Sequence, residues 1–222
     1  MTMRRVCDLV ALARAGDVSR FVTLAHDALG DAAFERLARR MAVDPVGARI
    51  LAERPRVAEA TFSRAELACL PEDTLGHAFL RHMSENGFDR DVDVPGLDLG
   101  TDGAYAKVRW RETHDFRHVL VGLNAGRPDE VVLAGFQLGQ VPNPFSLLVV
   151  AFVPLILPLR QGPFRTWHRA FTAWRAGRRA PLLANVRFEE LLGLPVAEVR
   201  RRTGAPNLAP LSTPWSPIGT TS

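Results

Sequence analysis

The chain has 222 residues, of which 47% are hydrophobic and 23% are charged. This length allows a sizeable buried core, and this composition excludes a disordered protein. The formal net charge of +4 at pH 7 comes from arginine, since Lys107 is the only lysine. Basic and acidic residues alternate and no recognition motif is present, so no nucleic-acid partner is expected.

The N-terminal region and the cysteines bear on the cellular compartment. Cys7 and Cys69 are the only cysteines, too few for a disulfide framework, which favours a reducing compartment. The apolar run near the N-terminus is interrupted by Asp8 and Arg14, and no small-residue cleavage site follows it. The sequence therefore predicts an amphipathic first helix rather than a signal peptide.

Most of the chain has the periodicity of helices. Apolar residues recur every three or four positions over residues 18–43. Capping signals place a helix after Asp44 that stops before Pro55, and another from Asp73 or Thr74 to Gly87. Further helices are predicted from about Gly103 to Gly122, from Pro128 to about Val141, and within residues 162–181 and 185–204. Few stretches alternate as strands do, so the predicted fold class is all-α.

Residues 144–160, PFSLLVVAFVPLILPLR, are the longest apolar stretch. They are too short to cross a bilayer, which takes about 20 apolar residues. One interpretation is a buried core helix kinked at Pro154. The other is a lipid-facing segment at a membrane interface, with Arg160 and Arg165 placed to meet headgroups.

The domain organisation predicted from these patterns is simple. Residues 1–204 are expected to form a single helical domain. Residues 205–222 contain four prolines, several hydroxyl groups and no charged side chain, so they are expected to form a flexible, disordered tail.

The segment THDFRHVLVGLNAGRPDE, residues 113–130, holds the strongest candidate site. On a helix, His118 lies about 40° round from His114, and Asp115 about 100° round, so the three side chains share one sector. Two imidazoles and a carboxylate suit zinc, iron or manganese. Glu130 follows a glycine-containing loop and is a plausible fourth ligand. The alternative is that His114 and Asp115 hydrogen-bond each other and Glu130 is an exposed acid.

Two other residue pairs are weaker candidate sites. His77 and His82 are five residues apart on one predicted helix, so their side chains diverge, and each is interpreted as a surface or capping histidine. Trp167 and Trp174 are seven residues apart on one helix face, a spacing more typical of a packed core than of a stacking platform.

The sequence contains the motif His-Asp-x-x-His, followed by eleven residues and Glu. This motif resembles the characteristic motif of a family of ubiquinone biosynthesis proteins that is usually called the fourth coenzyme Q protein. Further resemblance extends from about residue 20 to residue 204, and it is carried by residues 44–57, 67–83, 173–190 and 196–204. It implies an all-helical fold and a divalent metal, usually zinc with Fe²⁺ or Mn²⁺ as alternatives, bound by His114, Asp115, His118 and Glu130.

The resemblance also implies a role in maturing a quinone head group. One hypothesis is oxidative decarboxylation of a prenylated 4-hydroxybenzoate-type ring, with Glu130 as the catalytic residue that takes up a proton. A second is a non-catalytic, lipid-binding scaffold for a biosynthetic complex. A third is a relative that tailors a specialised aromatic or terpenoid metabolite.

Partners and location follow from the same resemblance. The expected partners are a prenylated aromatic substrate or lipid, other quinone-biosynthesis proteins, a membrane surface and a second copy of the chain as a homodimer. Residues 145–157 are the candidate wall of a groove for the polyprenyl tail. Because no long presequence rich in arginine and serine is present, the predicted location is the bacterial cytoplasm, peripheral on the inner face of the cytoplasmic membrane.

Overall fold

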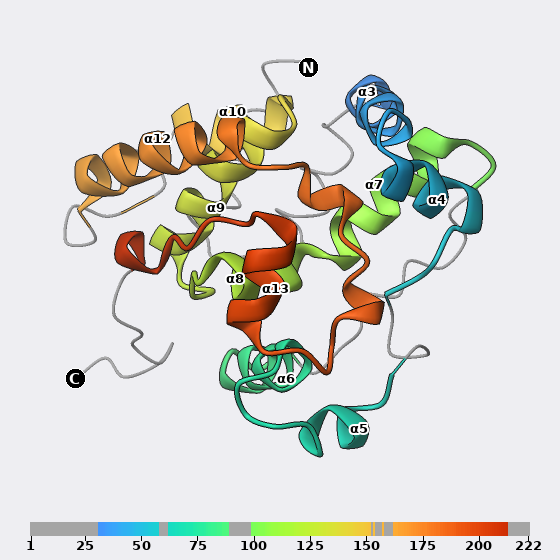
Figure 1. The fold of residues 1–222 in the computed structure, drawn as a ribbon. Helices are drawn as coiled ribbons and strands as arrows, with labels where there is room; N and C mark the ends of the chain where they lie inside the picture. Colours follow the sequence, from blue (N-terminus) through green and yellow to red (C-terminus); the bar gives the residue numbers. More distant parts are fainter. Residues whose placement is uncertain are drawn as a thin grey trace. The chain divides into compact units, whose positions relative to one another are not determined.

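A computed structural model describes residues 31–57, 62–88, 99–151, 153, 157 and 162–212. In this part of the chain the regular structure is helical and no strand is present, which confirms the all-α prediction (Figure 1). The chain divides into two compact units. The first unit comprises Met1–Ala33 and Arg127–Arg179, and the second comprises Phe34–Gly126 and Ala180–Ser222. The single domain predicted for residues 1–204 stays a prediction.

The helices of the first unit are α9 (Arg127–Gln140), α10 (Pro144–Ala151) and α12 (Pro163–Arg179). Those that lie wholly in the second unit are α4 (Pro45–Glu53), α5 (Arg64–Ala68), α6 (Leu75–Glu85), α7 (Asp102–Glu112), α8 (His114–Val121) and α13 (Val196–Thr203), with short 3-10 turns at Leu183–Asn185, Phe188–Glu190 and Ala209–Leu211. Helix α3 (Asp31–Ala42) begins in the first unit and continues into the second. The predicted amphipathic first helix and residues 18–30 of the next predicted helical stretch lie outside the described residues.

The predicted capping residues begin the helices to which they were assigned. The Asp44 carboxylate accepts hydrogen bonds from the backbone N–H groups of Val46 and Gly47. The Thr74 hydroxyl accepts one from the N–H of His77 at 3.4 Å. These side chains satisfy backbone donors that have no partner inside the first helical turn.

The predicted helix from Gly103 to Gly122 is wrong in one respect, because the structure divides it at Thr113. Helix α7 ends at Glu112 and α8 begins at His114, with Thr113 at φ −91° and ψ 9° between them. The Thr113 hydroxyl donates to the Arg109 carbonyl at 2.7 Å, and the Thr113 backbone N–H donates to the same carbonyl at 3.0 Å. The break places His114 in the first turn of a new helix.

Helix α8 lies between α6 and α13 in the second unit (Figure 1). Its Phe116 ring is fully buried and stacks on Phe79 of α6 with centroids 3.9 Å apart. At the C-terminal end of α8, Arg200 of α13 donates to the Leu120 carbonyl at 2.5 Å, which satisfies an otherwise open acceptor. The helix is therefore held on two sides and at its end.

The beginning of the predicted tail is packed rather than separate from the second unit. The backbone N–H of Leu208 donates to the Val121 carbonyl at 2.7 Å, and the Leu208 side chain is buried. Residues 205–212 thus belong to the described structure, and the remainder of the predicted tail, residues 213–222, lies outside the described residues.

A buried arginine also holds the junction of α7 and α8. Arg117 donates to the Thr113 hydroxyl at 2.8 Å and to the Trp110 carbonyl at 2.6 Å, and its guanidinium lies 4.0 Å from the Trp110 ring centroid. Burial lowers the pKa of Arg117 to about 9, which still leaves the side chain charged at neutral pH. A planar guanidinium can stack and donate at the same time, which a lysine ammonium cannot do.

In the first unit, α9 and α12 are in close backbone contact. A Cβ atom on Gly135 would overlap the Ala170 carbonyl oxygen, one on Gly139 would overlap that of Trp174, and one on Gly177 would overlap that of Phe136. Glycine is needed at these positions because the neighbouring group is a backbone carbonyl, which cannot move aside as a side chain can.

The apolar stretch at residues 144–160 contributes to the core of the first unit. Val149, Val153 and Leu157 are buried in a cluster with Val131 and Ala134 of α9. The described part supports the interpretation as a core segment, while Pro154 and Arg160 lie outside the described residues. Among the helices that the structure describes, none combines the length and the apolar character needed to span a membrane.

We expect Gly135→Ala to destabilise the protein by about 2 kcal/mol, because the added methyl group forces α9 away from α12. The overlap outweighs the gain of about 1 kcal/mol in helix propensity. Urea unfolding followed by circular dichroism measures the change. Gly193→Ala is the matched control, since nothing lies within 4 Å of its added Cβ. Equal stability of the two variants would contradict the close contact.

Candidate metal centre

Three side chains of α8 bring their metal-binding atoms together. One ligand atom each from His114, Asp115 and His118 lies within 4.8 Å of the others. The Nε2 atoms of the two histidines face each other at 3.3 Å. The one-turn spacing of the histidines causes this convergence, because residues i and i+4 lie on the same helix face.

The site is partly enclosed by the second unit. His118 is fully buried, whereas His114 and Asp115 are intermediate between buried and exposed. His82 of α6 reaches the same place, with its ring stacked on that of His118 at a centroid distance of 5.3 Å. Its Nε2 atom lies 3.8 Å from Asp115 Oδ1. The site therefore has one wall from α8 and another from α6.

The electrostatics of the site favour an ionised Asp115. Burial raises the pKa of this carboxyl, but the nearby His82 N–H and the His114 and His118 rings lower it by more, so the net pKa is below its ordinary value. A carboxylate that stays ionised at neutral pH is the form that coordinates a metal.

The donor set fits a divalent metal. Two imidazole nitrogens that face each other at 3.3 Å can make at most one hydrogen bond between them, whereas a cation between them would engage both lone pairs. Imidazole and carboxylate together suit zinc and the neighbouring divalent transition metals. Three protein ligands would leave coordination open for a further group, as a reactive site requires.

Glu130 lies in the first turn of α9, in the first unit. The converging group on α8 is made of the other three predicted ligands, so ligation by Glu130 stays a prediction. Its neighbour Asp129 is fully buried and accepts a hydrogen bond from Arg169 of α12 at 3.0 Å. This ion pair anchors the helical turn on which Glu130 stands.

His82 was misjudged from the sequence. The prediction of a surface or capping histidine is wrong, because the side chain is only 8% exposed and lies against the α8 site. The spacing between His77 and His82 carried no signal for this, since the relevant neighbour is on a different helix. The arginine at position 81 and the exposed Glu85 even mark that helix as partly solvated.

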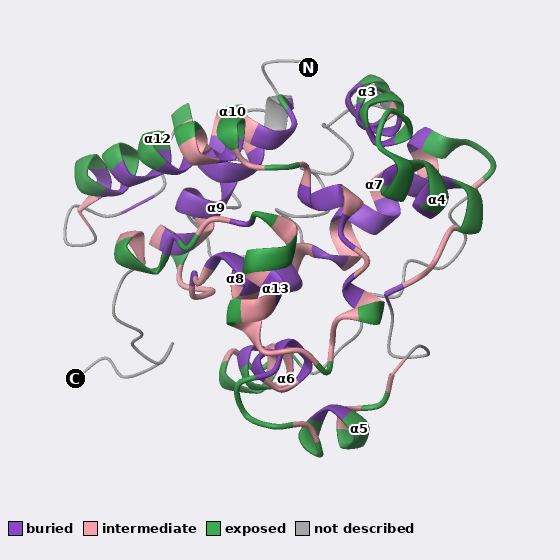
Figure 2. Cartoon of the chain, viewed as in Figure 1, coloured by how far each residue is buried: buried purple, intermediate pink, exposed green. Residues whose placement is uncertain are grey.

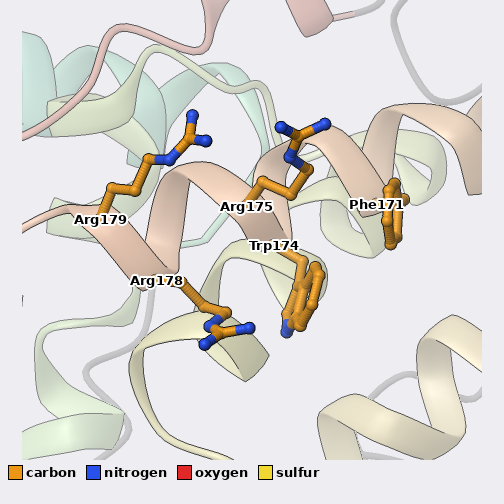
Figure 3. A pocket seen from close by; sticks show the side chains of 5 residues that line it. All are labelled: Phe171, Trp174, Arg175, Arg178 and Arg179. Carbon is orange, nitrogen blue, oxygen red and sulfur yellow. The ribbon is translucent and has the colours of Figure 1, made fainter.

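Helix α12 carries a second feature, a surface hollow of about 370 Å³ lined by aromatic and basic side chains (Figure 3). Trp174 and Arg178 lie on one side of the helix, with the guanidinium carbon 5.2 Å from the ring centroid, and Arg175 and Arg179 point to the other side. The expectation of a packed tryptophan face is wrong for Trp167, which is 51% exposed.

The comparison with known families decides where the chain belongs. A family model described as "Coenzyme Q (ubiquinone) biosynthesis protein Coq4" matches residues 3–208. The chain belongs to the Coq4 family.

Individual Coq4 relatives agree with this assignment. The mitochondrial ubiquinone biosynthesis protein COQ4 homolog of Rattus norvegicus is 33% identical over 168 residues, which are 74% of this chain and 63% of the rat protein. The mitochondrial COQ4 protein of Meyerozyma guilliermondii is 33% identical over 175 residues, 76% of this chain and 54% of that protein. The chain thus spans less than two thirds of the length of these relatives.

A solved Coq4-like structure supports the fold as well. The crystal structure of a ubiquinone biosynthesis protein from Nostoc punctiforme has a TM-score of 0.75 and 26% sequence identity to this chain. The similarity covers 91% of this chain and 95% of the Nostoc chain. The resemblance to the ubiquinone biosynthesis family inferred from the sequence is therefore confirmed.

The comparisons correct the predicted location. The bacterial cytoplasm, with peripheral attachment to the inner face of the cytoplasmic membrane, was inferred from the lack of a long presequence. The curated Coq4 relatives from rat, Meyerozyma guilliermondii and cattle are mitochondrial proteins, which contradicts that prediction.

We expect the purified protein to hold about one divalent metal ion per chain, because the three α8 donors converge. His118→Ala removes the buried imidazole and should abolish most of this metal binding. Inductively coupled plasma mass spectrometry measures the ratio of metal to protein after dialysis into metal-free buffer has removed loosely bound ions. Wild-type protein without metal, or equal metal in the variant, would contradict the site.

We expect Asp129→Asn to destabilise the protein by about 3 kcal/mol, because Arg169 would remain as a charge with no ionised partner in the interior of the first unit. Denaturant unfolding measures this change. Arg49→Ala is the control, since it removes an exposed ion pair to Glu53 that is screened by solvent and should leave the midpoint unchanged. A similar midpoint for both variants would show that the buried pair contributes little.

Proposed function

We propose that the protein acts in coenzyme Q biosynthesis as a metal-dependent enzyme that carries out oxidative decarboxylation of a prenylated 4-hydroxybenzoate-type ring. The convergence of the ligand atoms of His114, Asp115 and His118 on α8 is the observation that carries this proposal. Membership of the Coq4 family supports the biosynthetic setting, since the family model and the rat relative are both named for ubiquinone biosynthesis.

The proposed metal ligands are His114, Asp115, His118 and, from α9, Glu130. Zinc is the proposed metal, with Fe²⁺ or Mn²⁺ as alternatives that the same nitrogen and oxygen donors accept. When bound, the metal supplies a Lewis acid that polarises a carboxylate or phenolate oxygen of the ring. The His82 ring of α6 stacks on His118 of α8, which keeps the His118 imidazole oriented and excludes water from that side of the site.

The overall reaction consumes dioxygen together with two electrons and two protons from a reductant. The bond between the ring carbon and its carboxyl group breaks, and carbon dioxide is released. A carbon–oxygen bond forms at the same ring carbon, so that one oxygen atom enters the new hydroxyl group. The other oxygen atom leaves as water, which balances the atoms and the electrons.

Glu130 is the proposed catalytic residue for proton transfer. A glutamate in the first turn of a helix lies near its positive end, which favours the carboxylate form and makes it a ready proton acceptor. The adjacent ion pair between Asp129 and Arg169 fixes the backbone of that turn. The Glu130 side chain therefore extends from a fixed backbone position.

The prenyl tail of the substrate needs apolar surface. Val149, Val153 and Leu157, within the segment expected to form a groove wall, face the interior of the first unit instead. The exposed large apolar side chains described in that unit are Leu147 of α10 and three residues that share one face of α12, Phe164, Trp167 and Phe171. Figure 2 shows α12 divided into a buried and an exposed side. This face supports binding of a prenylated aromatic substrate or lipid.

The proposed protein partners are other quinone-biosynthesis proteins and a second copy of the chain in a homodimer. An apolar face with arginines nearby, as on α12, has the mixed composition found at protein interfaces. In the alternative function, a non-catalytic lipid-binding scaffold, the same face would contact the lipid and the metal would only hold helices together.

We expect Glu130→Gln to leave the protein folded and able to bind a prenylated lipid, yet to abolish function. The amide keeps the size of the side chain but cannot take up a proton at neutral pH. Circular dichroism and lipid binding test the fold, and respiratory growth of cells that lack their own family member tests function. Glu85→Gln, at an exposed position of α6, is the control and should complement fully.

Two outcomes separate the alternatives. Complementation by Glu130→Gln at normal expression would contradict catalysis through this residue. Unfolding of the variant on loss of metal would favour the scaffold, because the binding free energy of a structural metal is part of the folding free energy.

A further inference from the structure

His82 is the polar group of α6 that faces the α8 site. Its side chain is 8% exposed, and its Nε2 atom is buried without a hydrogen-bond partner in the described structure. A buried ring nitrogen with no hydrogen-bond partner is energetically unfavourable. The unpartnered His82 Nε2 atom therefore suggests that it gains a hydrogen-bond partner when the site is occupied.

The nearest acceptor for that nitrogen is the Asp115 carboxylate. His82 Nε2 and Asp115 Oδ1 are 3.8 Å apart, somewhat longer than a hydrogen bond. The His82 ring is stacked on His118 with an interplanar angle of 26°, so the ring cannot turn far without losing this contact. The Asp115 side chain is partly exposed, so it is less confined than the stacked His82 ring.

His82 does not qualify as a further metal ligand by its position. The ligand atoms of His114, Asp115 and His118 lie within 4.8 Å of one another, and His82 does not belong to this converging group. His82 contacts two members of the group, through its Nε2 atom near Asp115 and its ring on His118, without adding a ligand atom to it.

We propose that His82 is a positioning residue that donates its Nε2–H to the Asp115 carboxylate and thereby orients this carboxylate for the divalent metal. This inference rests on the proposed metal site. One oxygen of Asp115 is held by the imidazole and the other is left for the metal. Carboxylates that bind metals are commonly held in this way, and loss of the supporting group weakens metal binding by about 10- to 100-fold.

The packing of α6 against α8 through Phe79 and Phe116 fixes the distance between His82 and Asp115.

The test compares two substitutions in the full-length protein. His82→Phe keeps an aromatic ring between His118 and Phe88 but removes the donor. His82→Gln places an amide N–H near the position of Nε2. Affinities for Zn²⁺ and Co²⁺ are measured by competition with a chromophoric chelator. We expect His82→Phe to bind both ions about 10- to 100-fold more weakly than wild type, and His82→Gln to recover most of the affinity.

A spectroscopic readout separates positioning from ligation. X-ray absorption of the Co²⁺-loaded proteins counts the imidazole donors, and we expect the same number in wild type and in His82→Phe. One imidazole fewer in the variant would make His82 a ligand and overturn the proposal. Unchanged affinity of His82→Phe, or a glutamine variant as weak as the phenylalanine variant, would also overturn it.

His77→Phe is the matched control on the same helix. His77 lies about 140° round α6 from His82, and its Nδ1 atom is 3.0 Å from the Leu70 carbonyl. We expect wild-type metal affinity for this variant. Thermal unfolding of the metal-free proteins checks that His82→Phe retains its fold. If wild-type protein binds no metal, the proposed metal site fails and the inference fails with it, whereas equal binding by wild type and His82→Phe rejects the inference alone.

Discussion

The geometry of the candidate centre depends on one constraint, the one-turn spacing of two histidines on a helix that cannot rotate. His114 and His118 share a face of α8, their Nε2 atoms lie 3.3 Å apart, and His82 of α6 stacks on His118. Phe116 stacks on Phe79 of α6, and Arg117 donates to Thr113 and Trp110, so both side chains fix the rotation of α8. Packing of apolar and cationic side chains therefore orients the ligands.

The first unit depends on a different constraint, the close approach of the backbones of α9 and α12. Gly135 and Gly139 of α9 meet backbone carbonyls of α12, and Gly177 of α12 meets one of α9. Close backbone approach directs the remaining side chains outward or into a small apolar cluster with α10. The buried pair of Asp129 and Arg169 then fixes the start of α9. Glu130, the next residue, therefore extends from a rigid backbone.

A metal site of this kind needs support from residues that never touch the metal. His82 is such a residue by its distance from Asp115 and by its stacking on His118. Proton transfer and metal binding both require a carboxylate of defined orientation, and a free side chain on a helix surface does not provide it. The function proposed for the protein thus rests on the contact between α6 and α8 as much as on the motif of α8 itself.

The helices and the metal motif could be predicted from the sequence because both are local. Asp44 and Thr74 cap the helices that they precede, and the spacing of His114, Asp115 and His118 determines their common face through the helical repeat. The break at Thr113 has no counterpart in the helical periodicity of the sequence. The burial of His82 and the exposure of Trp167 depended on tertiary structure. Both result from neighbours distant in the sequence, because helical periodicity contains no information about which other helix will cover a given face.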